Sequence, residues 1–203
     1  MKILSLNDRS SAEIIHEATQ ILTQGGIIAY ASESYYALGV QAFDKNSLQR
    51  LFEIKQRPEG KPVPLIVGSM DILRTVATVP AQAEELIEQY WPGPLTIIFP
   101  AQTILPSLLT GTTGNVAMRI PGNKIALDLA KAFAAPLTAT SANISGSPPA
   151  ETAGDITDYF GDTIDLLIDS GRAPGGEPST IVNVTVIPPV IVRQGRIPLD
   201  LIK

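Results

Sequence analysis

The 203-residue sequence contains no cysteine. Disulfide bonds and thiolate metal sites are therefore excluded, which is consistent with a reducing compartment. Histidine occurs once, as His16, so a zinc site and a serine–histidine catalytic pair are not expected. The chain also lacks any apolar run close to the ~18 residues of a membrane span, and its first segment turns polar too soon for a signal peptide. We therefore expect a cytoplasmic protein that does not enter a membrane.

Basic residues are few, and they are unevenly distributed. The formal net charge is −5 and the pI is about 4.9, which argues against the broad basic surface typical of nucleic-acid binding. Lys55, Arg57 and Lys61 nevertheless fall within one short segment, whereas residues 75–118 contain no lysine or arginine. Such a cluster favours a local anion site, although most short basic clusters are only solvated surface charges.

The length and composition predict one domain covering residues 1–203. Single hydrophobic cores keep growing up to ~250 residues, and the hydrophobic content of 44% with 17% charged residues is ordinary for a globular protein. Internal repeats and low-complexity segments are not evident. Proline and glycine cluster only over short stretches, which we interpret as turns and not as linkers.

Hydrophobic periodicity predicts alternating helices and strands. Ser10 and Glu13 form a capping-box pattern before a helical period that ends at Gly25 and Gly26. Further helices are predicted over residues 46–54, 81–90 and 124–134, with Asn123 as the N-cap of the last. Short, nearly continuous apolar runs predict strands over residues 27–30, 64–67, 95–99, 116–120, 137–140, 166–168, 181–184 and 190–192. We expect the segment ASESYYALG, residues 31–39, to be a loop.

These elements predict an α/β fold with a twisted sheet of mixed parallel and antiparallel strands, flanked by helices. Continuous apolar strands indicate a sheet that is buried on both faces. The last two strands are too close in sequence for a helical crossover, so they should pair as an antiparallel hairpin or edge.

Familiar phosphate-binding motifs are missing, because neither GxxxxGK[ST] nor GxGxxG occurs. The candidate that remains is IKQRPEGKP, in which Lys55 and Arg57 are two residues apart and can converge in an extended backbone. A second candidate is PLTATSAN, where an apolar strand runs into Ser141 and Asn143. Ligands of open α/β sheets bind at strand ends, although both residues could simply cap a turn.

Two arginines end apolar strands. Arg119 closes VAMR and Arg193 closes VIVR, and a guanidinium in that position must reach solvent or pair with an anion. Ser179 lies in a glycine-rich segment just before another strand, as in a ligand-contacting loop or an ordinary turn. Together with the basic cluster, these arginines favour a carboxylate or phosphate ligand.

The chain resembles the YrdC/TsaC family of threonylcarbamoyl-AMP synthases over essentially its whole length. Seven segments occur in the family's order: GGIIAYASESYYALG, IKQRPEGKP, YWPGPLTIIF, VAMRIP, PLTATSANISG, APGGEPSTIVNVT and VIVRQGRI. The resemblance implies a YrdC-like fold with a basic concave cleft. It also implies condensation of threonine, bicarbonate or carbon dioxide, and ATP to threonylcarbamoyl-AMP and pyrophosphate, a nucleotidyltransferase reaction that supplies a tRNA modification.

The resemblance also implies roles for particular residues. Lys55 and Arg57 would act in catalysis, and the nucleotide would be bound by Lys55, Arg57, Lys61, Asn115, Ser141, Asn143 and Arg193. Threonine would be bound by Ser32, Ser34, Arg119, Ala139 and Ser179. Mg²⁺ would be carried by the ATP phosphates and not by a dedicated protein site. RNA, tRNA or proteins of tRNA modification would be partners.

Ala31, Ser32, Ser34 and Ala37 depart from the family's usual residues. Serine in place of threonine keeps the hydroxyl but loses the methyl group that restricts its rotamer. SESYYALG also resembles a YciO-like branch whose function is less settled, but the lysine, arginine and SAN residues favour the synthase. Double-stranded RNA binding without catalysis is a further alternative. A carbamoyl-transfer domain of a hydrogenase-maturation system is another, and the modules that accompany such a domain are missing here.

Overall fold

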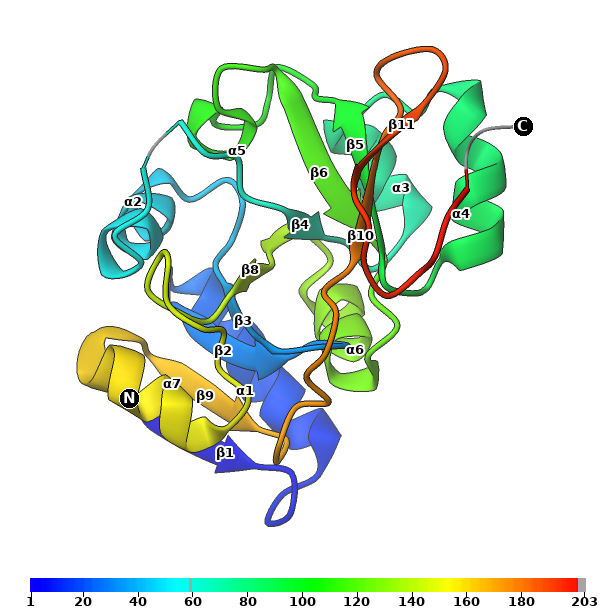
Figure 1. The fold of residues 1–203 in the computed structure, drawn as a ribbon. Coiled ribbons are helices and arrows are strands. Elements are labelled where there is room, and N and C mark those ends of the chain that lie inside the picture. The colour runs from blue at the N-terminus through cyan, green and yellow to red at the C-terminus, as the bar shows by residue number, and fades with distance from the viewer. Residues whose placement is uncertain (59, 201–203) are drawn as a thin grey trace.

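Two mixed β-sheets lie side by side and form the framework of the protein (Figure 1). The structure is a computed structural model that describes residues 1–58 and 60–200, so Glu59 of the IKQRPEGKP segment lies outside the described residues. The sequence predicted an α/β fold with mixed strands, which is confirmed. It predicted one sheet, however, and the strands divide between two.

The first sheet has five strands in the order β1-β9-β2-β3-β8. Its strands are β1 (Lys2–Ser5), β9 (Leu166–Asp169), β2 (Ile28–Ala31), β3 (Tyr36–Gly39) and β8 (Thr140–Ser141). The pairs β1 with β9 and β9 with β2 are parallel, whereas β3 is antiparallel to both of its neighbours.

The second sheet has six strands in the order β11-β10-β5-β6-β4-β7. Its strands are β11 (Val190–Arg193), β10 (Thr180–Asn183), β5 (Leu95–Pro100), β6 (Asn115–Arg119), β4 (Leu65–Ile66) and β7 (Leu137–Thr138). The predicted antiparallel pairing of the last two strands is confirmed, and it places β11 at the edge of the sheet.

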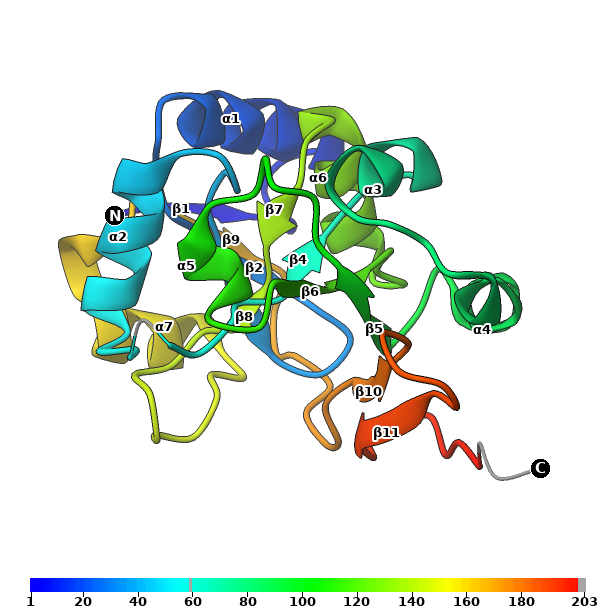
Figure 2. The ribbon, with the colours of Figure 1, turned by 90° about the horizontal axis from the view of Figure 1, so that it is seen from above.

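Helices cover both sheets. They are α1 (Ser11–Thr23), α2 (Lys45–Ile54), α3 (Met70–Val76), α4 (Glu84–Tyr90), α5 (Ser107–Thr110), α6 (Lys124–Phe133) and α7 (Ala153–Phe160), with short 3₁₀ turns η1 (Ala81–Ala83) and η2 (Gly161–Thr163). Figure 2 shows α1 and α6 together on one side of the five-stranded sheet. In the described part of the chain, no helix combines the length and the apolar character that a membrane span requires.

The helix boundaries follow from local capping. The Ser10 side chain accepts a hydrogen bond from the Glu13 backbone N–H, and the Glu13 carboxylate bonds back to the Ser10 N–H, so the predicted capping box is confirmed. Asn123 caps α6 as predicted, through bonds from the N–H groups of Ile125 and Ala126.

Strand β2 is buried on both of its faces, which explains its unbroken apolar run. Ile28 and Tyr30 pack in the cluster beneath α1 and α6, whereas Ala29 and Ala31 pack in the larger cluster on the other side. Successive side chains of a strand point to opposite faces, so burial of both faces requires apolar residues at every position. The predicted two-sided burial is confirmed for this strand.

Several elements differ from the sequence-based expectation. The segment 31–39 is not wholly a loop, because Tyr36–Gly39 forms the fully buried strand β3, which lies between β2 and β8. The run 137–140 was expected to be one strand but contributes to β7 and β8, which belong to different sheets. Strand β1 and helices α3, α5 and α7 were not anticipated.

The two sheets are joined where the chain changes sheet at Ala139. Thr138 is fully buried, and its Oγ1 accepts a hydrogen bond from Val40 N–H at 2.9 Å and donates to the Leu38 carbonyl at 3.2 Å. Its carbonyl accepts from the Tyr30 hydroxyl at 2.9 Å. Because this crossing ties the sheets together, we propose that the chain is one domain.

We expect Thr138→Val to lower the free energy of unfolding by about 1–3 kcal/mol, because the isosteric methyl leaves the buried Val40 N–H without its acceptor. Urea denaturation measures this change. The matched control is Thr157→Val, which removes an exposed hydroxyl on α7 and should change stability by less than ~0.5 kcal/mol. Equal effects of the two substitutions would contradict the proposed importance of the crossing.

Candidate functional site

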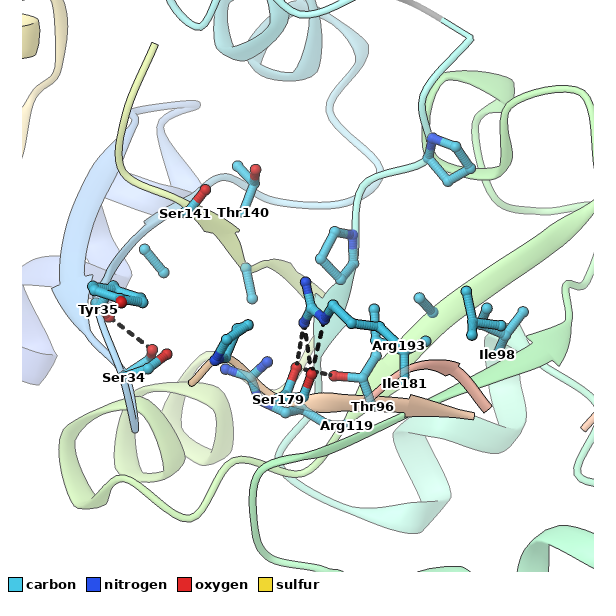
Figure 3. Close-up of a pocket in the computed structure, with 18 of the residues that line it drawn as sticks. Ser34, Tyr35, Thr96, Ile98, Arg119, Thr140, Ser141, Ser179, Ile181 and Arg193 are labelled. Carbon is cyan, nitrogen blue, oxygen red and sulfur yellow. Dashed lines mark hydrogen bonds between the residues drawn. The ribbon is translucent and has the colours of Figure 1, made fainter. Parts of the chain in front are cut away.

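A cavity of about 370 Å³ lies between the two sheets. Its walls come from the β2–β3 loop, β3, the segment after α2, strands β5, β6, β10 and β11, and the β7–β8 crossing. Residues that are far apart in the sequence therefore meet there, and Figure 3 shows the cavity with Ser34, Tyr35 and Ser141 across from Arg119, Ser179 and Arg193.

One wall is a face of the six-stranded sheet. Thr96 and Ile98 of β5, Arg119 of β6 and Ile181 of β10 all line the cavity. Thr96 pairs with Ile181 across the sheet, so these side chains occupy the same face. The residues between them along each strand point to the opposite, apolar face. Strand alternation therefore explains why the Arg119 side chain faces the cavity.

A β-bulge turns the edge strand toward the cavity. The register of β10 against β11 shifts between Ile181 and Val182. Val192 and Arg193 are consecutive, yet both line the cavity. Regular alternation would send them to opposite faces, whereas a bulge redirects one side chain, so the irregularity explains how both reach the same space.

The opposite wall carries hydroxyl groups. Ser32 and Ser34 come from the β2–β3 loop, and Thr140 and Ser141 come from β8. The Ser32 hydroxyl donates to the Tyr35 carbonyl at 2.7 Å, which fixes the turn. These groups offer short hydrogen bonds to a polar ligand.

Arg119 is buried and forms an ion pair with Glu33, at 3.1 Å between Nη2 and Oε2. The other carboxylate oxygen of Glu33 accepts a hydrogen bond from the Gly122 N–H at 2.7 Å. Burial alone would raise the pKa of Glu33, but the charge of Arg119 and the backbone N–H groups lower it overall. The expectation that Arg119 must pair with an anion or reach solvent is therefore met inside the protein.

Arg193 and Ser179 form a hydrogen-bonded group beside Arg119. The Arg193 guanidinium donates to the Ser179 carbonyl through Nη2 at 2.7 Å and through Nε at 3.1 Å. The Ser179 hydroxyl lies 2.9 Å from the Thr96 hydroxyl. Partial burial, together with the charge of Arg119, lowers the pKa of Arg193, although the residue as a whole is exposed to solvent.

Arg57 lines the cavity from the segment after α2. Its Nη2 donates to the Pro62 carbonyl at 2.6 Å and its Nε to the Lys61 carbonyl at 3.2 Å. Burial lowers its pKa as well. The backbone just before it is left-handed, with φ of 49° at Gln56, and this turn directs the chain from α2 toward the cavity.

Lys55 lies beneath the cavity and not on its surface. Lys55 as a whole is 1% exposed, and its ammonium donates to the carbonyl oxygens of Ser141 and Asn143, the latter at 2.8 Å. Its own carbonyl accepts from the Ser145 N–H at 2.8 Å. Burial, together with the charge of Arg57, lowers the pKa of Lys55 to about 7. Lys55 thus fastens the turn that follows β8.

Asn143 belongs to the same turn and also lies outside the cavity lining. It accepts a hydrogen bond from the Ser141 hydroxyl at 2.6 Å and donates to the Ser147 carbonyl at 2.6 Å. Through the first of these bonds it orients Ser141, which does line the cavity.

The structure brings together eight of the twelve site residues expected from the sequence. Ser32, Ser34, Arg57, Arg119, Ala139, Ser141, Ser179 and Arg193 line the cavity. Lys55 and Asn143 lie outside the lining and hold the turn that follows β8. Lys61 is exposed, and Asn115 lies at the end of β6 opposite Arg119, so neither belongs to the lining of the described cavity.

Other lining residues were not anticipated. Thr96 is a buried polar residue within an apolar strand. This exception to the apolar pattern is the feature of the sequence that could have identified it as a site residue. Tyr35 and Thr140 also line the cavity. Glu33, which contacts Arg119 from behind the lining, was not singled out, because its partner could not be identified from sequence spacing.

A glycine-rich segment borders the cavity and is tied to the opposite loop. The Gly175 N–H donates to the Ser34 carbonyl, and the Tyr35 hydroxyl donates to the Gly176 carbonyl, each at 2.7 Å. Both glycines have positive φ, of 66° and 80°, which side chains other than glycine rarely adopt. The segment therefore fixes the β2–β3 loop at the rim.

The arrangement suits an anionic ligand. Arg57, Arg119 and Arg193 converge on a space whose described lining includes no carboxylate, and the pKa values of two of them are lowered by burial. Arginine forks bind carboxylates and phosphates through paired hydrogen bonds. Within residues 1–58 and 60–200, no group of three or more histidine, cysteine or acidic residues could hold a metal ion.

Comparison with protein families matches residues 20–195 to the Sua5/YciO/YrdC family model, described as "Telomere recombination". The chain is 36% identical to a threonylcarbamoyl-AMP synthase of Pyrococcus abyssi, covering 98% of this chain and 58% of the relative. It is 31% identical to a threonylcarbamoyl-AMP synthase of Klebsiella pneumoniae, covering 87% of this chain and 94% of the relative.

Solved structures of this family are also similar to the chain. P. abyssi Sua5 complexed with L-threonine superposes with a TM-score of 0.91 at 35% identity, covering 98% of this chain and 58% of that one. E. coli YciO superposes with a TM-score of 0.84 at 31% identity, covering 96% and 95%. The chain thus spans little more than half the length of the P. abyssi relative but nearly all of the shorter ones.

The lowered pKa of Lys55 makes stability depend on pH. Above pH 7 the folded protein holds Lys55 neutral, whereas the unfolded chain keeps this proton until its ordinary pKa of about 10.5, so unfolding takes up a proton. We expect the free energy of unfolding to rise between pH 7 and 10, by at most about 1.4 kcal/mol per pH unit from this group.

Urea denaturation of the wild type and of the uncharged variant Lys55→Met across this pH range isolates the contribution of Lys55 to the free energy of unfolding. The variant should lack the rise, and ¹⁵N NMR titration of the Lys55 amine should give a midpoint near 7 in the folded wild type. Parallel pH profiles for the two proteins would contradict this expectation.

Proposed function

Because the chain belongs to the Sua5/YciO/YrdC family, we propose that it is a threonylcarbamoyl-AMP synthase. The reaction joins L-threonine, bicarbonate or carbon dioxide, and ATP, and it releases pyrophosphate. The observation that carries the proposal is the convergence of Arg57, Arg119 and Arg193 on one cavity with serine hydroxyls. The substrates bring a triphosphate and a carboxylate, which are the anions that such a cavity would bind.

The proposed roles divide the cavity into two regions. Arg57 and Arg193 bind the triphosphate, and Ser141 contacts the nucleotide from the opposite wall. Arg119 binds the threonine carboxylate, with Ser32, Ser34, Ala139 and Ser179 around the rest of the amino acid. Lys55 and Asn143 act indirectly by holding the turn after β8, and Lys61 and Asn115 have no direct contact assigned.

In the proposed chemistry, the threonine amine is first carboxylated to a carbamate, with loss of a proton when carbon dioxide reacts or of water when bicarbonate reacts. A carbamate oxygen then attacks the α-phosphorus, and the bond to the pyrophosphate oxygen breaks as the new bond forms. The protein needs no nucleophile, because positioning of the reactants and neutralisation of the phosphate charge supply the catalysis. Mg²⁺, brought in by the ATP phosphates, would add to that neutralisation. The product would then pass to the proteins that modify adenosine in tRNA.

The first test is pyrophosphate release from ATP and bicarbonate, with and without threonine. Release that depends on threonine supports the synthase. ATP binding without threonine-dependent release would contradict it and favour a protein that uses a different acyl substrate, as in a YciO-like branch. Binding of double-stranded RNA that is independent of ATP and steeply weakened by salt would instead favour an RNA-binding module.

We expect Arg57→Ala to lower threonine-dependent pyrophosphate release by about 10²–10³-fold, because a charge that stabilises the phosphates in the transition state is lost. The matched control is Arg50→Ala, which removes an arginine of α2 that pairs with Asp165 away from the cavity. Arg50→Ala should retain activity, and thermal melting of both variants separates loss of fold from loss of function. Equal activity of the two variants would contradict the role of Arg57.

A further inference from the structure

We propose that Glu33 is a positioning residue, which holds Arg119 in the orientation that receives the amino-acid carboxylate. The inference rests on the proposed function, because it concerns the same cavity. Glu33 itself does not line the cavity; it contacts Arg119 from behind. Its effect on a ligand must therefore pass through the guanidinium.

The geometry of the pair supports this role. The side chains of Arg119 and Glu33 are 10% and 12% exposed, so the ion pair is largely shielded from water. Among the described residues, the hydrogen bond of Arg119 uses Nη2 alone, and its buried Nε has no partner. A guanidinium held at a single nitrogen keeps donors available for a second anion.

Glu33 is itself held at its carboxylate, and the backbone just before it is held as well. Its Oε1 accepts from the Gly122 N–H at 2.7 Å, just before the N-cap of α6. The next residue back, Ser32, receives a hydrogen bond at its carbonyl from the Asn123 side chain. The carboxylate therefore cannot swing freely, and this fixes the direction in which it holds Arg119.

The pair also joins the two sheets. Glu33 lies in the β2–β3 loop of the five-stranded sheet, and Arg119 ends β6 of the six-stranded sheet. The same loop carries Ser32 and Ser34, so the contact sets the distance between these hydroxyls and the arginine. Loss of the contact would change the orientation of Arg119 and the spacing of the amino-acid region together.

Charge and positioning predict opposite results for Glu33→Gln. If Glu33 only offset the charge of Arg119, its removal would leave a stronger cation and tighten binding of a carboxylate. If Glu33 positions Arg119, removal weakens binding, because the fixed orientation of the guanidinium is lost. We expect KM for threonine to rise about 10–100-fold, as for loss of a hydrogen bond to a charged group, with kcat and KM for ATP close to wild type.

Glu33→Asp separates the two causes further. It keeps the charge but shortens the side chain, so it cannot span the contact made at 3.1 Å. Positioning predicts a raised KM for threonine in this variant too, whereas a charge effect predicts wild-type behaviour. Asp128→Asn is the matched control, because it removes the carboxylate of the Lys124–Asp128 ion pair on α6, away from the cavity. It should leave every kinetic constant unchanged.

A spectroscopic measurement tests positioning without turnover. The ¹⁵N–¹H signal of the Arg119 Nε, assigned by its loss in Arg119→Lys, should shift and broaden in Glu33→Gln but not in Asp128→Asn. If the wild type lacks threonine-dependent turnover, the proposed function fails, and this signal still decides whether Glu33 orients Arg119. Should Glu33→Gln not fold, Glu33→Asp replaces it in both measurements.

An unchanged Arg119 signal in the Glu33 variant would overturn the proposal. So would an unchanged or lowered KM for threonine in an active enzyme, or a fall in kcat with KM retained, which would place Glu33 in the chemical step. A changed signal together with a raised KM for threonine would support it.

Discussion

The cavity depends on the way the chain passes from one sheet to the other at Ala139. β7 and β8 are consecutive, yet each pairs with a different sheet. The Ala139 N–H is bonded to the Pro64 carbonyl at 2.8 Å, and Thr138 is bonded to the end of β3, so the crossing has little freedom to move. The two walls are thereby fixed face to face, and side chains that strand alternation directs inward from each wall meet in one space.

An acidic protein can still contain a space that suits an anionic ligand. The net charge of −5 describes the whole chain, whereas the cavity gathers three arginines, two of whose pKa values are lowered by burial. One of the three, Arg119, has a buried carboxylate partner. The cavity is thus not a uniform concentration of positive charge, and an incoming phosphate would meet Arg57 and Arg193 as the less compensated cations.

Local patterns in the sequence predicted the elements that local chemistry determines. Sequence patterns alone predicted the capping box of α1, the N-cap of α6 and the two-sided burial of β2. Helix α7 carries a comparable capping signal in Thr152 and Asp155, but its apolar pattern, with only Ile156 and Phe160 buried, is too short to predict a helix. The loop expected at residues 31–39 is present only over residues 32–35, because Tyr36–Gly39 forms the buried strand β3. The serines and tyrosines of the segment concealed that strand. The pairing of Glu33 with Arg119 joins residues 86 positions apart, which periodicity cannot reveal.

The bulge between β10 and β11 has a consequence for how such a cavity can change. Arg193 faces the cavity because of the number of residues in the edge strand β11 relative to its neighbour β10. Contacts deep in the core do not set its direction. An insertion or deletion of one residue in the hairpin would exchange the side chains facing the cavity while leaving the buried strands in register. The ligand preference of the fold can therefore diverge through changes in hairpin length, a route that does not require the interior to repack.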